Sequence, residues 1–273
     1  TISHKDKKYS IQVGSPEIIY KKTNIPVVSD FREYDIRYGG NGAPLMPLLD
    51  WFLFKESNIN IISINIGGIS NLSLISKNMR RDNIIGFDMG PGMCLIDRYV
   101  KKQWNKKYDK DGFLSSKGNI NIDLLIFLMK DSLVNKKPPK SISTENYNDI
   151  YIDRICNEFP NINHYDILRS LVNFTAVSIA NNIRKYISKT YLNHYELIIS
   201  GGGVKNKILL LDIKNEFESI NVSKLNMNGL DIDNKEAFLM CLLGYTKILN
   251  IPNNLPSVTG ASMYTVCGKL YEF

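Results

Sequence analysis

The first third of the chain alternates short runs of apolar and polar residues, which is the pattern of β-strands. We predict strands at residues 9–13 and 25–28, and two more within residues 64–75, on either side of Gly67 and Gly68. A Gly-Gly pair between two alternating runs is typical of a β-hairpin, because glycine readily adopts the positive φ angles of tight turns.

Other segments have helical spacing, in which apolar residues recur every three or four positions. Ser15 followed by Pro16 marks one helix start, because Ser caps helices and Pro is tolerated at the first helical position. Further helices are predicted at residues 45–54, 122–133, 165–186, 209–217 and 235–249. Residues 195–200 read as a buried strand. Hairpin strands followed by alternating helices and strands predict an α/β fold with a mixed β-sheet flanked by helices.

Residues 86–92 (GFDMGPG) follow an apolar pair that ends a third strand, and an apolar, helical run begins at Met93. The turn therefore holds one carboxylate, Asp88, where glycines let a ligand approach the backbone and helix amides attract anions. Such a carboxylate can take a proton from a nucleophile that attacks a bound phosphate. The alternative is a plain strand-to-helix connection that Asp88 caps.

Two other glycine turns fit a phosphate-binding site. Successive backbone amides at the Gly67-Gly68 turn would form a small anion-binding concavity, although most such hairpins bind nothing. A second turn follows the strand at 195–200 and consists of three glycines, Gly201, Gly202 and Gly203. A tight turn without a ligand is the alternative interpretation there.

Composition narrows the function classes. With 273 residues, 44% of them hydrophobic and 22% charged, the chain is typical of a globular protein. The net charge of +7 comes from lysines spread along the whole sequence. Because no basic stripe alternates with aromatic residues, we expect no nucleic-acid partner. No apolar run is long enough to span a bilayer, and the four cysteines lack metal-binding spacing, so we expect no membrane partner, no protein metal site and a cytoplasmic location.

Several motifs, taken in order, resemble the anhydro-N-acetylmuramic acid kinase family. They run through the whole chain, and although each is only suggestive by itself, their order and spacing are specific. The matching stretches are residues 28–32 (VSDFR) with 39–45 (GGNGAPL), 65–72 (NIGGISNL), 86–92 (GFDMGPG), 200–206 (SGGGVKN) and 255–261 (LPSVTGA).

The resemblance implies an actin-like, two-domain sugar kinase fold with ATP and Mg²⁺ in the cleft. The implied enzyme opens the 1,6-anhydro ring of anhydro-N-acetylmuramic acid with water while O6 takes the γ-phosphoryl group. The product is N-acetylmuramic acid 6-phosphate, in the recycling of peptidoglycan. On this basis residues 1–54 would be the remnant of an incomplete first domain, and residues 55–273 the second domain with the hairpin, the catalytic turn and the C-terminal segment.

The resemblance also assigns roles to residues. Asp88 would be the general base that activates the water, and Glu236 would face the sugar, unless it only supplies a favourable charge at a helix start. Arg32 and Asp35 would form or support the sugar-side wall; alternatively, they form a salt bridge with each other. The nucleotide would contact Gly67, Gly68, Gly201, Gly202, Gly203 and Asn206.

Departures from the family pattern leave a second hypothesis open. The family's N-terminal phosphate loop, a Ser-Gly-Thr-Ser-x-Asp-Gly-x-Asp stretch, is absent, and Met93, Asn41 and Ser143-Thr144 stand where Asn, Gln and Gly-Arg are usual. The alternative is therefore a non-catalytic, truncated remnant that folds or dimerises without turnover. An exposed sheet edge in residues 1–54 would favour a homodimer or poor solubility.

Overall fold

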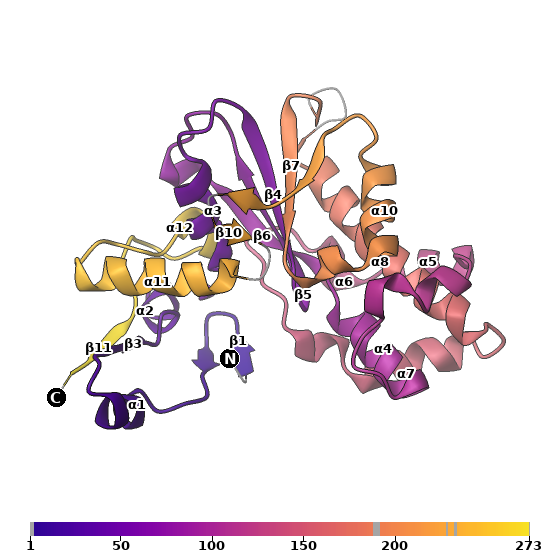
Figure 1. Ribbon diagram of the computed structural model, residues 1–273, viewed down its shortest axis with the longest axis horizontal. Helices are drawn as coiled ribbons and strands as arrows, with labels where there is room; N and C mark the ends of the chain where they lie inside the picture. The colour runs from indigo at the N-terminus through magenta and orange to yellow at the C-terminus, as the bar shows by residue number, and fades with distance from the viewer. Residues whose placement is uncertain (1–2, 188–191, 228, 232–233, 273) are drawn as a thin grey trace.

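The computed structural model describes residues 3–187, 192–227, 229–231 and 234–272. At its centre is a five-stranded mixed sheet with the order β6-β5-β4-β7-β8 (Figure 1). β4 and β5 form the predicted hairpin, β6 pairs antiparallel with β5, and β7 and β8 run parallel to β4. The strands are β4 (Asn60–Ile66), β5 (Ile69–Ile75), β6 (Ile85–Pro91), β7 (Tyr195–Ser200) and β8 (Val222–Lys224). The mixed sheet is confirmed, and it contains the predicted hairpin, the predicted strand near Ile84 and the predicted strand at residues 195–200, whereas the strands predicted at residues 9–13 and 25–28 belong to separate two-stranded sheets.

One face of this sheet packs on a helical layer, drawn to its right in Figure 1. The long helix α8 (His164–Arg184) contacts β6, and α10, α5 and α4 pack against α8. The largest hydrophobic cluster fills this space and includes Ile62 and Ile64 of β4 and Leu72 of β5. The bounds of the other helices in this layer are α4 (Cys94–Trp104), α5 (Ile122–Met129), α6 (Ser132–Asn135), α7 (Asp149–Glu158) and α10 (Lys207–Glu216).

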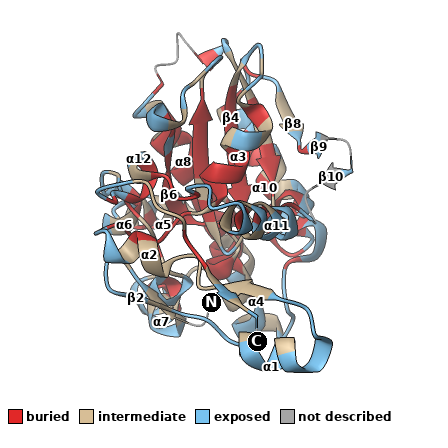
Figure 2. Cartoon of the chain, turned by 90° about the vertical axis from the view of Figure 1, so that its left-hand side faces the viewer, coloured by how far each residue is buried: buried red, intermediate tan, exposed pale blue. Residues whose placement is uncertain are grey.

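The opposite face of the sheet is covered by helices from both ends of the chain. α3 (Met46–Phe54) packs on β5 and on α11 (Lys235–Ile248), and α12 (Pro256–Thr259) contacts β6. A second, smaller cluster of buried apolar residues joins α3, α11 and α12. Figure 2 shows that buried residues concentrate in the sheet and in the helices packed directly on it.

The remaining N-terminal elements lie beside α11 and close to the C-terminus (Figure 1). β1 (Ser3–Lys5) and β2 (Tyr9–Ile11) form a hairpin, and α1 (Pro16–Thr23) begins after the predicted cap, whose hydroxyl accepts from Ile18 N. β3 (Val27–Ser29) pairs with the C-terminal β11 (Lys269–Tyr271), ahead of α2 (Glu33–Arg37). The short elements that complete the fold are β9 (Asn226–Met227), β10 (Leu230–Asp231) and the 3₁₀ turns η1 (Arg81–Asn83), η2 (Lys110–Gly112), η3 (Ser115–Lys117), η4 (Thr144–Tyr147) and η5 (Gly202–Lys205).

The predicted position of Asp88 needs correction. Residues 85–91 are themselves a strand, β6, so Asp88 lies within the sheet and not on a turn that follows a strand. Asp88 does not cap the next helix either, because the N-cap residue of α4 is Met93, which makes no side-chain cap hydrogen bond.

One helix prediction also needs correction. Residues 122–133 do not form one helix: α5 ends at Met129, and α6 begins after Asp131, whose carboxylate accepts from Leu133 N and Val134 N. A local side-chain cap therefore overrides the continuous apolar pattern. The helix α7 was not predicted, although Asn148 caps it by accepting from Tyr151 N. Over the described residues, none of the helices combines the length and apolarity needed to cross a membrane.

Candidate active site

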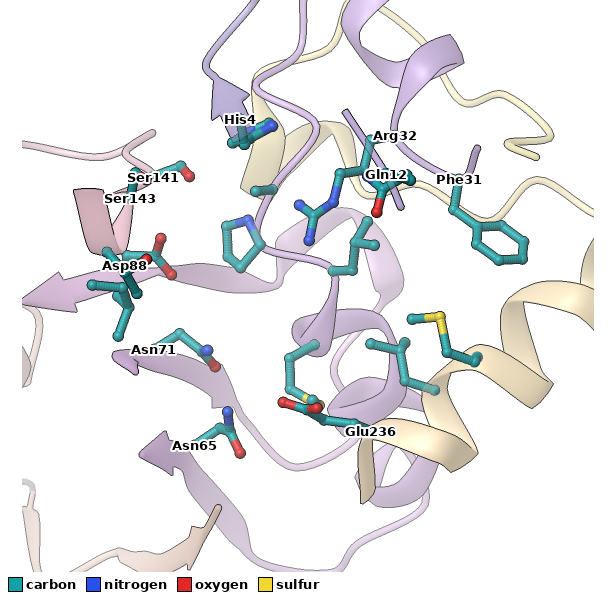
Figure 3. Close-up of a pocket in the computed structure, with 18 of the residues that line it drawn as sticks. His4, Gln12, Phe31, Arg32, Asn65, Asn71, Asp88, Ser141, Ser143 and Glu236 are labelled. Atoms are coloured by element: carbon teal, nitrogen blue, oxygen red, sulfur yellow. The ribbon is translucent and has the colours of Figure 1, made fainter. Parts of the chain in front are cut away.

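A cavity of about 750 Å³ lies between the polar face of the sheet, the start of α11 and the N-terminal segments. Figure 3 shows its labelled side chains converging from five parts of the chain. They come from the β1–β2 hairpin and the segment after it, the segment after β3, the sheet, the loop before η4, and α11: His4, Gln12, Phe31, Arg32, Asn65, Asn71, Asp88, Ser141, Ser143 and Glu236.

The sheet contributes a row of polar side chains. The strand register places Ser200 opposite Asn65, Asn65 opposite Asn71, and Asn71 opposite Asp88, across β7, β4, β5 and β6. Side chains alternate between the two faces of a strand, so the neighbours of these residues point into the apolar core instead. Asn65, Asn71 and Asp88 line the cavity, as Figure 3 shows on adjacent strands.

The row depends on an irregularity between β5 and β6. Ser70 pairs with Gly90, but the next residue, Asn71, pairs with Asp88, so Met89 is the extra residue of a register shift. Without this shift, Asn71 would lie opposite Met89. Bulges often re-aim a side chain beside a functional site, and this one brings Asp88 level with the asparagines.

Asp88 is held by a loop that arrives from the other side. Its Oδ2 accepts from Ile142 N at 2.8 Å, and its own N–H donates to Lys140 O at 3.3 Å. The residue is only 6% exposed, and this burial raises the pKa of the carboxyl to about 7. The Ile142 amide and the charges of Arg32 and Lys140 act in the opposite direction. A carboxyl that ionises near neutral pH can serve as a general base.

Arg32 and Glu236 border the same cavity from other elements. Arg32 precedes α2, and its Nη1 donates to Gly42 O at 2.7 Å. Burial lowers the pKa of Arg32, whereas the carboxylates of Asp88 and Asp35 raise it. Glu236 is exposed in the first turn of α11. Glu236 is therefore both a charge at the start of a helix and a side chain that borders the cavity.

Asp35 lies behind the cavity wall and not among the residues that line it. It is 1% exposed, and its carboxylate accepts from Gly42 N at 2.8 Å, from Asn254 Nδ2 at 2.9 Å and from Thr259 Oγ1 at 2.8 Å. The side chain thus joins the glycine loop near Arg32 to the C-terminal segment. Among the ion pairs of the described residues, none joins Arg32 to Asp35.

The Gly67-Gly68 turn rests on the start of α4. Gly67 O accepts from Met93 N at 2.8 Å, and Gly68 O accepts from Gly92 N at 2.9 Å and from Cys94 N at 3.1 Å. A Cβ on Gly92 would overlap Gly67 O, so this residue must be glycine for the contact to form. Met93 also packs against the main core cluster.

The second glycine turn meets the same end of β4. A Cβ on Gly201 would lie 2.7 Å from Ile66 O, and one on Gly203 would lie 2.8 Å from Ile66 Cβ, whereas Gly202 has nothing within 4 Å. Both glycine turns therefore lie at one edge of the sheet, beyond Asn65 and outside the lining of the cavity.

Asn206 is placed by the helix that follows. It caps α10, accepting from Ile208 N and Leu209 N at 3.1 Å each, and is 3% exposed. It does not line the cavity.

Sequence reasoning missed the two asparagines of the polar row. Both flank the glycine turn, and their pairing follows from the hairpin register. Asn71 Oδ1 is buried and has no hydrogen-bond partner in the part of the chain that the structure describes, so it can accept from a bound hydroxyl. In the described part of the chain no group of three or more His, Cys, Asp or Glu side chains could hold a metal. Mg²⁺ that is bound mainly by phosphates and water needs only one or two protein carboxylates. The cavity supplies such groups with Asp88 and Glu236.

Sequence comparisons with known proteins give one consistent result. The sequence model of the family described as anhydro-N-acetylmuramic acid kinase matches residues 1–273. The anhydro-N-acetylmuramic acid kinase of Clostridioides difficile (strain 630) is 35% identical over 276 residues, covering 99% of this chain and 72% of that protein. The enzyme of the same name from Pasteurella multocida is 35% identical over 263 residues, covering 96% and 68%. A solved structure, the activator of the 2-hydroxyisocaproyl-CoA dehydratase from Clostridium difficile with bound ADPNP, matches with a TM-score of 0.41 and 14% identity over 74% of this chain and 65% of that one.

Proposed function

Because this chain belongs to the anhydro-N-acetylmuramic acid kinase family, we propose that it uses ATP to open and phosphorylate 1,6-anhydro-N-acetylmuramic acid. The product is N-acetylmuramic acid 6-phosphate, formed in the recycling of peptidoglycan. The observation that carries this assignment is Asp88, a buried carboxyl whose pKa is raised to about 7 and which borders a cavity of about 750 Å³.

Asp88 supplies the proton acceptor of the reaction. As water attacks C1, its proton passes to the Asp88 carboxylate and the bond between C1 and O6 breaks. O6 then forms a bond to the γ-phosphorus while the bond from that phosphorus to the β,γ-bridging oxygen breaks and ADP leaves. Mg²⁺ would neutralise phosphate charge during this transfer. The carboxylate must be deprotonated before the step, so activity requires a pH near or above its pKa.

Other residues of the site bind and orient the sugar. Arg32 lines the cavity with a half-buried guanidinium that can donate to oxygens or an anionic group. Glu236 faces the same cavity, and Asn71 Oδ1 has no hydrogen-bond partner among the described residues. Asp35 supports the wall indirectly, through Gly42.

The nucleotide is assigned to the edge of the sheet where the two glycine turns meet. Gly67 and Gly68 would cradle phosphate, and Gly201, Gly202 and Gly203 would pack against the adenine and ribose. Gly202 supports this assignment because a Cβ there would have open space around it. Asn206 would hold the end of this turn through its cap on α10.

We also propose a domain organisation, a cellular location and an oligomeric state for this protein. Residues 1–54 would belong to the first domain and residues 55–273 to the second domain, which carries the hairpin, Asp88 on β6 and the C-terminal segment. The enzyme would work in the cytoplasm, where ATP is present. A homodimer is the assembly to test first.

The test is Asp88→Asn in the full natural chain, with Asp123→Asn on the exposed start of α5 as the matched control. Turnover should fall by roughly 10²–10⁴-fold, the usual contribution of a positioned base. ATP affinity should stay within about twofold, because the side chain faces the sugar. Near-normal turnover in Asp88→Asn would refute the role of the carboxylate. No sugar phosphorylation by the unmodified protein would instead favour the non-catalytic alternative.

A further inference from the structure

Lys140 is a fully buried lysine that the proposed reaction does not use. It is 0% exposed, and its Nζ donates to Val134 O at 2.8 Å, to Asn182 Oδ1 at 3.1 Å and to Leu133 O at 3.4 Å. All three of these acceptors are neutral oxygens. Lysine is almost never fully buried unless it is paired, so an ammonium held by neutral oxygens calls for a local reason.

The hydrogen bonds around Lys140 close a ring that contains Asp88. Asn182, on α8, accepts from the lysine and donates through Nδ2 to Met89 O at 3.1 Å. Met89 directly follows Asp88, whose N–H donates to Lys140 O. One lysine thus contacts the catalytic strand twice, directly through its carbonyl and indirectly through Asn182.

The same loop supplies the hydrogen bond on the carboxylate. Two residues after Lys140, Ile142 N donates to Asp88 Oδ2 at 2.8 Å. The ammonium group ties the loop to the carbonyls of Leu133 and Val134 and to α8, so it fixes where this amide lies. If the ammonium were lost, the loop would keep its backbone contacts to β6 but lose its attachment to α6 and α8.

We propose that Lys140 and Asn182 are positioning residues that hold Asp88 and the Ile142 amide in the geometry needed for proton transfer. The inference rests on the proposed role of Asp88 as the general base. Lys140 itself contacts neither substrate nor reacting atoms, since it lies outside the lining of the cavity.

The charges around Asp88 and Lys140 determine which way the pKa of Asp88 should move when Lys140 is replaced. The pKa of Asp88, raised to about 7 by burial, is lowered by Arg32 before α2 and by Lys140 and raised by Asp6 of the β1–β2 turn. Burial lowers the pKa of Lys140 to about 8, with Lys185 and Lys136 acting the same way and Asp88 and Asp131 acting against them. The three hydrogen bonds that Lys140 Nζ donates fit an ammonium group, which has three donors, so Lys140 is a positive charge near Asp88. Removing its charge should make Asp88 harder to ionise, so the pKa of Asp88 should rise.

The experiment compares Lys140→Met with Lys137→Met in the full natural enzyme. Lys137 is exposed in the same loop, so its variant makes the same chemical change outside the ring. In Lys140→Met, the acidic limb of the kcat/KM profile should move up by about half a unit to one unit. At pH 7, kcat should fall tenfold or more, while KM for ATP stays within twofold. Lys137→Met should leave both kcat and the limb unchanged.

A second variant covers the case in which Lys140→Met does not fold. Asn182→Ala keeps the charge of Lys140 but opens the ring, so kcat should fall severalfold with KM for ATP unchanged and with little movement of the acidic limb. Rates are normalised to folded protein by circular dichroism and thermal unfolding.

The outcomes separate this inference from the proposed function. Unchanged kcat and an unmoved limb in Lys140→Met, or unchanged kcat in Asn182→Ala, would overturn the positioning role even if Asp88→Asn is inactive. If Asp88→Asn keeps its turnover, the role of Asp88 fails first, and the inference fails with it.

Discussion

The two faces of the central sheet are built from the same strands but have opposite character. Toward α8, the side chains form a continuous apolar surface that includes Ile64, Leu72 and Phe87, each fully buried. Toward α3 and α11, the alternate positions of the same strands are largely polar. These are Ser63, Asn65, Asn71, Ser73, Asp88 and Ser200.

The polar face is itself divided. Near Asp88 it borders the cavity, but further along a buried ion pair fills it: Lys235 Nζ lies 2.6 Å from Asp50 Oδ1, and the two side chains are 2% and 1% exposed. Lys235 also donates to Ser200 Oγ at 3.1 Å and to Ser63 Oγ at 3.3 Å. The apolar face therefore gains stability from burial alone, whereas the polar face depends on specific partners.

The largest expected difference between the faces appears when one partner of the ion pair is removed. Lys235→Met leaves Asp50 charged and unpaired in the interior, so the free energy of unfolding should fall by about 3–5 kcal/mol. The matched control is Leu243→Met, a fully buried apolar position on the same helix, where the loss should be below about 1.5 kcal/mol. Denaturant unfolding followed by circular dichroism measures both.

A double variant sharpens this result. Lys235→Met combined with Asp50→Leu removes both charges, and a buried ion pair replaced by apolar side chains often costs little. It should therefore regain more than half of the lost stability, although the Ser73 hydroxyl loses its bond to Asp50. Equal losses for Lys235→Met and Leu243→Met would show that the polar face behaves like the apolar one.

A smaller effect separates stability from function at Asp88. Its folded-state pKa, about 7, lies above the ordinary value of 3.8, so its contribution to stability is complete below about pH 4 and is lost as the pH rises through 7. Asp88→Asn removes this charge but can still accept from Ile142 N. As the pH rises from 5 to 8, the free energy of unfolding of the variant should therefore increase by about 2–3 kcal/mol relative to that of the natural protein, at about 1.4 kcal/mol per pKa unit. Measuring the free energy of unfolding of both proteins at pH 5 and pH 8 tests this. If their difference is the same at both pH values, burial does not raise the pKa of Asp88.

Local sequence patterns predict much of the fold. The alternating strands, the hairpin at Gly67-Gly68 and the Ser15 cap depend on near neighbours, and all are confirmed. The reason given for the two glycines is wrong, however, because neither Gly67 nor Gly68 adopts a positive φ angle. The strand in residues 195–200 was also recognised, because a short apolar run bounded by glycines has few other interpretations.

The candidate site was only partly predictable, because its geometry depends on contacts distant in sequence. The bulge at Met89 aligns Asp88 with Asn71, and no periodicity reveals an extra residue in one strand. The hydrogen bond from Asn254 to Asp35 joins residues 219 positions apart. Likewise, the buried positions of Lys140 and Lys235 contradict the usual exposure of lysine, and no local sequence pattern distinguishes them from the other lysines.

The smallest expected change in stability distinguishes two adjacent glycines at the edge of the sheet. Gly203→Ala would press its Cβ against the buried Ile66, so the free energy of unfolding should fall by about 1–3 kcal/mol. Gly202→Ala meets nothing within 4 Å and should stay within about 0.5 kcal/mol of the natural protein. If the nucleotide packs on this turn, however, Gly202→Ala should weaken ATP binding by about tenfold, measured by calorimetry. If Gly202→Ala leaves ATP affinity unchanged, the nucleotide does not pack on this turn, and the close approach of Gly201 and Gly203 to Ile66 of β4 is then the reason for glycine at those two positions.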